Sequence, residues 1–398
     1  MLRRKRSPRL LRPHQPMMFS NRDNSKPLKN QLIAGFGRIM RQTWAMGMVL
    51  GALLFGLTAV STTTMAKAEQ LAPVDQGRTT VLAYFRFGED EFPDASVRLD
   101  QFEQHLNLLT QATVDVVSLP SALAALEGAT PAAHDRSRVA ITIDNAYRSV
   151  YDHAWPRLKA LGLPFTLFVA TDLIDGGAAA YMSWDQIREL AGAGVTIGLR
   201  GASHAHLPAL TDLALLKDIR HSLSRLEAEL GVTARLFSYP YGEYGTRVIN
   251  VLDSHGFVAA FGQHSGVMAA GPSPFTYPRF PITEQFADAE RFQLAINALP
   301  LVIHERTPAD NALNTREPQI GFTVDDAMGP LARLNCFATG QGELPLTRIG
   351  RRVELRLQAP FEPGRGRINC TLPVAWDQDA QRSDQERWRW LGMNFYVP

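Results

Sequence analysis

The stretch VAITIDN, residues 139–145, decides the fold of this chain. Its first five residues are apolar or β-branched, and such a run next to polar residues predicts a buried strand. Asp144 and Asn145 follow directly. In a parallel sheet they would lie at the edge where α/β proteins build their sites.

Runs of the same kind recur on both sides of this stretch and alternate with amphipathic segments. We expect strands at residues 81–85, 114–117, 165–169, 195–198 and 236–239. Apolar residues at helical spacing predict helices at residues 99–109, 149–161, 184–193, 213–230 and 246–255. The alternation predicts an α/β fold, with a parallel sheet and covering helices, open or closed into a barrel.

The pattern changes near Thr307. A polar stretch bracketed by prolines comes first, and the remaining β-prone runs are short and separated by glycine and proline. We therefore predict a linker at residues 307–317 and a small all-β module at residues 318–398. The α/β domain would then span residues 69–306.

The first 68 residues are predicted to form a leader and an export signal. Arg38 and Arg41 precede an apolar run at residues 44–60, and Ala66-Lys67-Ala68 offers a small-residue cleavage site. We expect cleavage after about Ala68 and a periplasmic or secreted protein. The alternative is an uncleaved membrane anchor, although the run is shorter than the roughly 20 residues of a spanning helix. The true start is open among several methionines, which include Met17, Met18 and Met40.

Composition narrows the classes of function. The 398 residues carry a formal net charge of +2, with 45% hydrophobic and 20% charged residues, as in an ordinary globular protein. Much of the basicity lies in the leader, so the mature protein has no charge pattern for nucleic acid.

Cys336 and Cys370 are expected to pair in an exported protein, and their disulfide would stabilise the β module by roughly 3 kcal/mol.

Polar side chains follow three of the predicted strands. Besides Asp144 and Asn145, the strand at residues 195–198 is followed by Arg200, Ser203, His204 and His206. The strand at residues 236–239 leads into Tyr239-Pro240-Tyr241-Gly242. Because the carboxyl ends of parallel strands meet at one edge, we expect these groups to converge in one site.

These segments resemble the motifs of the NodB-homology, or chitooligosaccharide deacetylase-like, polysaccharide deacetylases. AITIDNAY, residues 140–147, is similar to the TFDDG segment, and residues 182–207 are similar to the stretch that ends in H-[ST]-x-x-H. FSYPYGEY, residues 237–244, is similar to the third motif, and YPRFP, residues 277–281, fits one branch of the family. The resemblance covers residues 81–301 and implies a NodB-type distorted (β/α) barrel.

The resemblance also implies an activity, the hydrolysis of N- or O-acetyl groups on a cell-envelope or chitin-like polysaccharide or oligosaccharide. In the family, a first aspartate is the general base. A second aspartate and two histidines hold a divalent metal, usually zinc, which activates water and steadies the oxyanion. An acetylated glycan is the implied partner, and only an uncleaved signal would bring the protein to a membrane.

Carried over residue by residue, the resemblance assigns Asp144 as the base and His204 as a metal ligand. Asn145 stands at the position of the metal-binding aspartate, and Arg200 at that of the first histidine. An amide is a weaker, neutral donor, and an arginine has no lone pair to offer. One good ligand therefore remains of the three that a catalytic zinc needs.

Further roles follow from the same resemblance. Motif three implies substrate binding by Tyr239, Pro240, Tyr241 and Gly242. Ser238 stands where many members carry an arginine that orients the base, and Arg279 is a candidate replacement. His304, in Leu301-x-x-His304, falls on the histidine of the last motif, which acts as general acid.

A charge count links the two departures from the family pattern. An intact site sums the +2 of the metal and the −2 of two carboxylates. With the metal lost and Asn145 in place of one carboxylate, Asp144 leaves −1, and Arg200 returns the sum to zero. Because a buried carboxylate needs a partner, we expect Arg200 beside Asp144, where the metal would be, in a protein that holds no metal.

Each assignment has an alternative. Asp144 could cap the following helix, and His204 could be a histidine that supports neighbouring groups. His206 is a substitute ligand or a loop residue, and His304 is a general acid or a residue of the pocket rim.

Aromatic residues are concentrated in the tail. Trp388 and Trp390 share one face of a predicted strand, and Trp376, Phe395 and Tyr396 lie nearby. They predict either a sugar-stacking platform or the core of a small module, and we favour the core.

Three functions remain open from the sequence. The first is a deacetylase with a weakened metal site, which family resemblance favours. The second is a metal-free pseudoenzyme that binds glycan without catalysis, which Asn145 and Arg200 favour. The third is a structural role in which the β module mediates assembly at the cell envelope.

Overall fold

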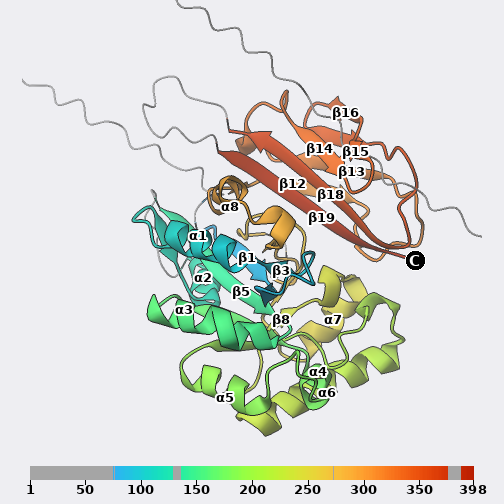
Figure 1. The fold of residues 1–398 in the computed structure, drawn as a ribbon. Coiled ribbons are helices and arrows are strands. Elements are labelled where there is room, and N and C mark those ends of the chain that lie inside the picture. The colour runs from blue at the N-terminus through green and yellow to red at the C-terminus, as the bar shows by residue number, and fades with distance from the viewer. Residues whose placement is uncertain (1–74, 76, 129–135, 272, 375–386) are drawn as a thin grey trace, which may run out of the picture. The chain divides into compact units, whose positions relative to one another are not determined.

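Strand β5 (Ser137–Asp144), which contains most of the VAITIDN stretch, lies inside an eight-stranded sheet whose pairings are parallel (Figure 1). The strand order is β10-β1-β5-β6-β7-β8-β9, and β4 also pairs with β5. The other strands are β1 (Thr80–Tyr84), β4 (Val114–Val116), β6 (Phe165–Val169), β7 (Thr196–Leu199), β8 (Leu236–Ser238), β9 (Ala259–Phe261) and β10 (Phe280–Pro281). The predicted strands are therefore confirmed to within two residues.

The computed structural model describes residues 75, 77–128, 136–271, 273–374 and 387–398. The predicted leader and signal at residues 1–68 and the tryptophan at position 376 lie outside the described residues.

The parallel sheet curls toward a barrel. Phe261 of β9 forms a bridge with Tyr277, and Leu82 of β1 pairs with Phe280 of β10. The short segment that contains Tyr277 and β10 thus connects the two edges of the sheet. The predicted α/β fold of the NodB-type distorted barrel is confirmed.

Helices cover the sheet, and the sequence explains where several of them begin and end. Ser183 caps α5 in a reciprocal pair of hydrogen bonds with Gln186, and Gly231, at φ 66°, ends α6. The helix predicted from Ser149 begins as a π-helical turn at Val150–Ala154. The α-helices are α1 (Leu99–Leu109), α2 (Leu119–Leu126), α3 (Trp155–Ala160), α4 (Thr171–Asp175), α5 (Trp184–Gly192), α6 (Asp212–Leu230), α7 (Thr246–Ser254) and α8 (Ala289–Ile296). None of the helices in the described residues has the length and apolar character needed to cross a membrane.

The carboxyl-terminal part is an all-β module, as predicted. One sheet has the order β11-β19-β18-β14-β15 and the other β12-β13-β17-β16, and their inner faces share one hydrophobic core. Cys336 of β14 and Cys370 of β18 face each other across the two strands and form the predicted disulfide. The strands are β11 (Leu299–Pro300), β12 (Ile303–Thr307), β13 (Ile320–Val324), β14 (Asn335–Ala338), β15 (Gly342–Glu343), β16 (Leu346–Ile349), β17 (Arg352–Leu355), β18 (Gly364–Pro373) and β19 (Trp388–Val397).

The β module begins earlier than the sequence predicted. β11 pairs with β19 and β12 pairs with β13, so the module starts at about Leu299. The residues expected to form a linker at 307–317 are part of it. Asn311 is buried and donates to the carbonyl of Asn394 at 2.7 Å. A proline-bracketed polar segment was mistaken for a linker because its hydrogen bonds go to a strand about 80 residues away.

The long strands β18 and β19 rest on the α/β domain. A Cβ on Gly392 would lie 2.3 Å from the carbonyl oxygen of Ser265, so only glycine allows this close approach. Trp390 packs edge-on against Phe280 at 5.3 Å, on the side of the barrel core. The prediction that the tail aromatics fill the module's core is therefore wrong for Trp390 and right for Phe395.

Candidate functional site

Side chains from four other segments of the barrel meet at one carboxylate, that of Asp144. It is the last residue of β5 and is fully buried. Arg200 follows β7 directly, Ser238 ends β8, Gln263 follows β9, and Arg279 precedes β10. Parallel strands place these side chains at one edge of the sheet, as the sequence predicted.

Arg200 is in direct contact with Asp144. Its Nη1 lies 2.5 Å from Oδ2 of Asp144 and also donates to Oγ of Ser238 at 2.5 Å. Both partners are buried, with side-chain exposures of 2% for Arg200 and 0% for Asp144. The contact predicted from the charge count is confirmed.

Arg279 binds the same carboxylate from the other side. Its Nη1 and Nη2 donate to Oδ1 and Oδ2 of Asp144, each at 2.9 Å, so the pair is bidentate. Nε donates to the carbonyl of Gly262 at 2.8 Å, and Nη1 also donates to Oγ1 of Thr142 at 3.0 Å. Nη2 of Arg279 also donates to Oγ of Ser238 at 2.8 Å, so both residues bind the same carboxylate.

These contacts fix the charge states of the cluster. Burial works to raise the pKa of Asp144, but Arg200 and Arg279 outweigh it and hold that pKa below its ordinary value. Burial lowers the pKa of Arg200 to about 10, partly offset by Asp144, so Arg200 stays charged at neutral pH. Two guanidiniums at +2 and one carboxylate at −1 leave the buried cluster at +1. The sequence count of zero omitted Arg279.

The residues at the family's metal positions do not fit a catalytic divalent metal. Oδ1 of Asn145 and Nε2 of His204 are buried without a partner in the described part of the chain, so two lone pairs remain. Burial, and then the charge of Arg200, lower the pKa of His204 to about 3, which keeps it neutral. The third position holds the guanidinium of Arg200, which has no lone pair and repels a cation. Two neutral donors beside a net positive charge fall short of the three ligands of a catalytic site.

The loop after β7 is fixed by Asp218 of α6. Its two oxygens accept from the backbone N–H groups of Ala202 and Ser203, both at 2.9 Å. Gly201, at φ 75°, leaves room for this carboxylate, because a Cβ there would lie 2.5 Å from Oδ1. Asp218 therefore positions Arg200 and His204 on either side of the turn.

Aromatic rings line the edge of the site. The imidazole of His206 stacks on Tyr241 at 4.1 Å and an interplanar angle of 8°, and His204 lies 4.8 Å from the same ring. Nδ1 of His206 is 2.6 Å from Oε2 of Glu243, so this carboxylate orients the ring, and the role of His206 as a substitute ligand stays a prediction. On the far side, Tyr147 stacks on Tyr181 at 5.1 Å.

The four residues predicted to bind substrate are not equivalent. Tyr239 and Pro240 are buried, and the hydroxyl of Tyr239 donates to the carbonyl of Phe275 at 3.0 Å. Gly242 is needed for packing, since a Cβ there would lie 2.5 Å from the Cβ of Gln263. Tyr241 is the partly exposed member of the four and the one that is able to touch a ligand.

His304 lies away from the cluster around Asp144. It belongs to β12 of the β module, is 56% exposed, and its Nε2 contacts Oδ2 of Asp325 at 2.8 Å. It lines a cavity of about 790 Å³ together with His264 and Trp390. Pairing with β13 places His304 in a sheet of the β module, and its role as general acid stays a prediction.

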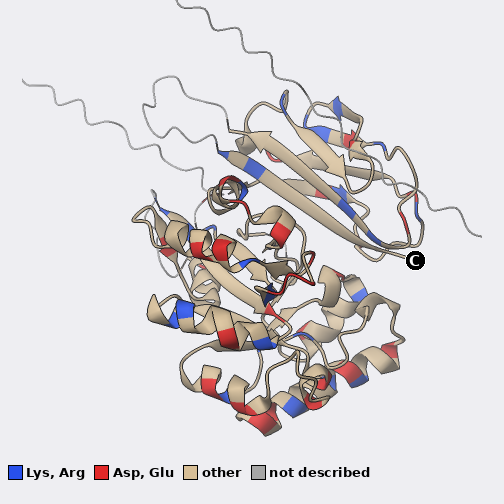
Figure 2. Cartoon of the chain, in the orientation of Figure 1, with Lys and Arg blue, Asp and Glu red and all other residues tan. Residues whose placement is uncertain are grey.

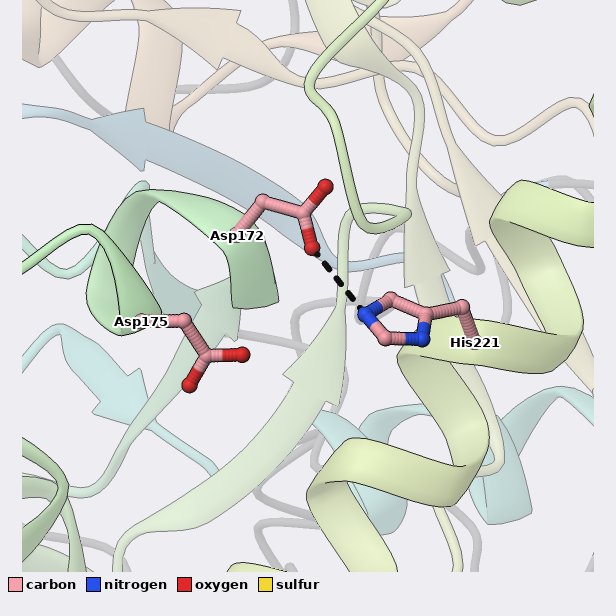
Figure 3. Close-up of side chains that lie close together, drawn as sticks. All are labelled: Asp172, Asp175 and His221. Atoms are coloured by element: carbon pink, nitrogen blue, oxygen red, sulfur yellow. Dashed lines mark ion pairs between the residues drawn. The ribbon is translucent and has the colours of Figure 1, made fainter.

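A separate group of acidic and histidine side chains lies on α4 and α6. Figure 3 shows the imidazole of His221 facing Asp172, with Nε2 3.3 Å from Oδ1, and Asp175 on the same helix as Asp172. Asp175 already receives Arg225 on both oxygens, at 2.8 and 2.6 Å, and the indole N–H of Trp184 at 2.7 Å. All three members are exposed, and the charge of Asp175 is balanced, so the cluster gives no ground for a metal centre.

Sequence reasoning missed several groups that shape the site. Asp218 lies on a helix with no motif, and Gln263, 3.5 Å from Oδ2 of Asp144, follows a short strand that was not predicted. Arg86 lies over the rings of Tyr147 and Phe92, at 3.7 and 4.1 Å. The position of Arg86, just after the first predicted strand, was the one signal that could have indicated its place at this edge.

Comparisons with known proteins identify what the α/β domain is similar to. Residues 132–260 match the family model for polysaccharide deacetylase. The Bacillus subtilis (strain 168) protein YxkH, whose name assigns it to the polysaccharide deacetylases, is 26% identical over 119 residues. That match covers 30% of this chain and 42% of the relative, so it spans about two fifths of the relative's length.

Solved structures show the same fold. The Streptococcus pyogenes deacetylase PplD, in complex with acetate, matches with a TM-score of 0.51 and 20% identity over 55% of this chain and 98% of that chain. IcaB from Ammonifex degensii matches with a TM-score of 0.49 and 27% identity over 54% of this chain and 97% of that chain. Together these comparisons indicate that the α/β domain is similar to the NodB-type polysaccharide deacetylases.

Proposed function

We propose that this protein is an exported pseudoenzyme of the polysaccharide deacetylase family, which binds a glycan in the deacetylase groove without hydrolysing it. The buried ion pair between Arg200 and Asp144 carries the proposal. It places a fixed positive charge at a position where the family needs a metal-binding histidine.

The state of Asp144 argues against its use as a general base. Oδ2 accepts from Arg200, Arg279 and Ser238, and Oδ1 accepts from Arg279. A base needs a free lone pair within reach of the proton it removes and a pKa close to the working pH. Asp144 has its oxygens engaged and a lowered pKa, so its role is to hold two arginines together.

The backbone at the site supports a retained binding function. Five non-glycine residues of the described chain have positive φ, and all but the last lie here: Asn145, Ala146, His204, Tyr241 and Glu305. Such conformations each cost on the order of 1–3 kcal/mol and persist where the surroundings enforce them, often at binding sites. The strained turns hold His204 and Tyr241 against each other at the groove.

Similarity to this family supports a second candidate, a deacetylase that still works with a weakened metal site. The two candidates differ in acetate release. We expect the mature protein to bind N-acetylchitohexaose in calorimetry and to release no acetate from it, with or without added zinc. Acetate release that depends on Asp144 would establish the second candidate instead.

Restoring the family's residues at positions 145 and 200 tests whether these two replacements account for the loss of metal binding. The double variant Asn145→Asp with Arg200→His restores the family's three ligand types around His204, and we expect it to bind zinc while either single variant does not. Arg188→His, at an exposed position on α5, is the matched control and should bind none. A double variant that folds, binds glycan and still takes up no zinc would show that the loss has another cause.

Export is part of this proposal. Its support is the leader at residues 1–68, with basic, apolar and small-residue zones in order, together with the disulfide between Cys336 and Cys370. Sequencing of the amino terminus of protein recovered from the cell envelope fraction would locate the cleavage site, which we expect after about Ala68.

A further inference from the structure

Two arginines of the β module lie beside the loop that follows β8 of the α/β domain. Arg365 and Arg367 are two positions apart on β18 and therefore point to the same face. Their partners across the ladder are Tyr396 and Asn394 of β19. Figure 2 shows basic residues on both of these long strands.

Direct contacts fix this end of the β module to the loop that follows β8. Nη1 of Arg365 donates to the carbonyl of Tyr241 at 3.1 Å. Nδ2 of Asn394 donates to the carbonyl of Gly242 at 2.8 Å. This loop contains the Tyr239-Pro240-Tyr241-Gly242 segment, so the β module is bound directly to the candidate site.

The two guanidiniums share one nearby carboxylate, that of Glu243, so a net positive charge remains. Within the described residues neither Arg365 nor Arg367 makes an ion pair, and the nearby carboxylate of Glu243 is paired with His206. Nε of Arg367 is buried without a partner. Burial, and then repulsion by Arg365, lower the pKa of Arg367 to about 10, so the group remains charged at neutral pH. Like charges held together while partly desolvated are costly unless an anion joins them.

Aromatic rings stand next to these charges. Tyr396 lies 6.4 Å from His206, which in turn stacks on Tyr241. We call the group of Arg365, Arg367, Tyr396, His206 and Tyr241 the module rim. It combines the ring faces on which sugars stack with guanidiniums whose paired N–H groups match a carboxylate.

We propose that the module rim binds a uronic acid residue, so that the ligand of this protein is an acidic polysaccharide. The inference rests on the proposed glycan-binding function and deepens it. The buried cluster of Arg200, Arg279 and Asp144 adds a net charge of +1. The positive charge of the cluster and the rim together favours an anionic chain over a neutral one.

The test compares two hexasaccharides that both carry N-acetylated amino sugars. Hyaluronan hexasaccharide alternates them with uronic acid, whereas N-acetylchitohexaose is neutral. In titration calorimetry at about 50 mM salt we expect hyaluronan to bind at least about tenfold more tightly, and this preference to shrink at about 200 mM salt because screening weakens exposed charge pairs.

Variants assign the preference to the rim. Arg365→Gln with Arg367→Gln should bring the ratio of the two affinities close to one. Arg235→Gln with Arg356→Gln removes the same charge from exposed positions elsewhere and should keep the ratio. Tyr396→Ala should weaken binding of both sugars, and melting temperatures would confirm that every variant is folded.

The outcomes separate this inference from the function beneath it. Equal affinities in the wild type, or a preference that survives Arg365→Gln with Arg367→Gln, would overturn the role of the module rim while glycan binding stands. Absence of binding to both hexasaccharides by the folded wild type would overturn the proposed function and the rim together.

Discussion

Arg200 and Asp144, 56 positions apart in the sequence, meet with 2.5 Å between Nη1 and Oδ2 in a fully buried pair. A buried ion pair is seldom a net source of stability, because desolvation offsets most of the attraction. Breaking it by removing one partner is nevertheless costly, since a charge is then left buried and uncompensated. Arg200 and Asp144 therefore depend on each other, because the charge of each compensates the buried charge of the other.

A double-mutant cycle tests this dependence. Arg200→Met leaves Asp144 with Arg279 alone, and we expect a loss of about 2–3 kcal/mol in the free energy of unfolding. Asp144→Asn leaves two guanidiniums facing each other, and we expect a larger loss of about 3–5 kcal/mol. The double variant should lose less than the sum of the two. Arg188→Met, at an exposed pair, should stay within about 0.5 kcal/mol, and additive losses at Arg200 and Asp144 would contradict the coupling.

Stability is expected to fall as the pH drops from about 7 to 4, before most carboxylates titrate. Burial lowers the pKa of His105 to about 4, and that of both His204 and His264 to about 3. In the unfolded chain these groups titrate near 6.5, so below that pH the unfolded state binds more protons and gains population. Urea titrations at several pH values measure how steeply the free energy of unfolding falls with pH.

His105 is the group with which to test this pH dependence. It is fully buried, with Nδ1 3.0 Å from the hydroxyl of Tyr84 and Nε2 2.9 Å from the carbonyl of Ala287. A shift from 6.5 to about 4 corresponds to about 3 kcal/mol lost between those pH values. His105→Gln should be less stable at pH 7 and should show a shallower slope, by about one proton. An unchanged slope would mean that His105 is protonated in the folded protein.

Docking of the β module is predicted to depend on Gly392. A Cβ at this position would collide with backbone atoms of Ser265, which have little freedom to move. Gly392→Ala should cost about 1–3 kcal/mol and expose the β18–β19 face to protease. Gly192→Ala, at a helical position with open space around it, should be neutral or slightly stabilising. Equal protease resistance of both variants would contradict the close approach.

The disulfide is predicted to stabilise the β module. It joins β14 and β18 across 34 residues, and the chain-entropy model gives a contribution on the order of 3 kcal/mol. Cys336→Ala with Cys370→Ala should lower the melting temperature as much as reduction of the wild type does. If reduction changes the melting temperature of the double variant too, the reductant acts elsewhere.

The sequence predicted the α/β domain well because local pattern and tertiary structure agree there. Six of the eight parallel strands are apolar runs long enough to recognise, whereas β9 and β10 are too short, and α1 has the bounds that helical periodicity gave. The Arg200–Asp144 contact followed from the family resemblance together with a charge count. Gln263 and Asp218 could not be found in this way, because neither stands in a motif and both act through a fold that brings distant segments together.

The sequence predicted that the carboxyl-terminal part is an all-β module, but it did not show where the module begins. Strands of two residues, such as β11, carry no periodicity, and their pairing with β19 depends on a partner about 90 residues away. For the same reason, the four-residue pattern around His304 could not show that its strand joins a sheet of the β module. The same non-local pairing places Arg365, Arg367 and Tyr396 at the groove, a position that the tail sequence did not indicate.

The most direct test of the loss of metal chemistry is the metal content of the purified mature protein. Elemental analysis after exposure to excess zinc and removal of unbound ion should find far less than one zinc per chain, because Arg200 occupies the ligand position beside Asp144. One equivalent of zinc, retained by the wild type and lost in Asp144→Ala or His204→Ala, would contradict a metal-independent site and restore hydrolysis as the expected function.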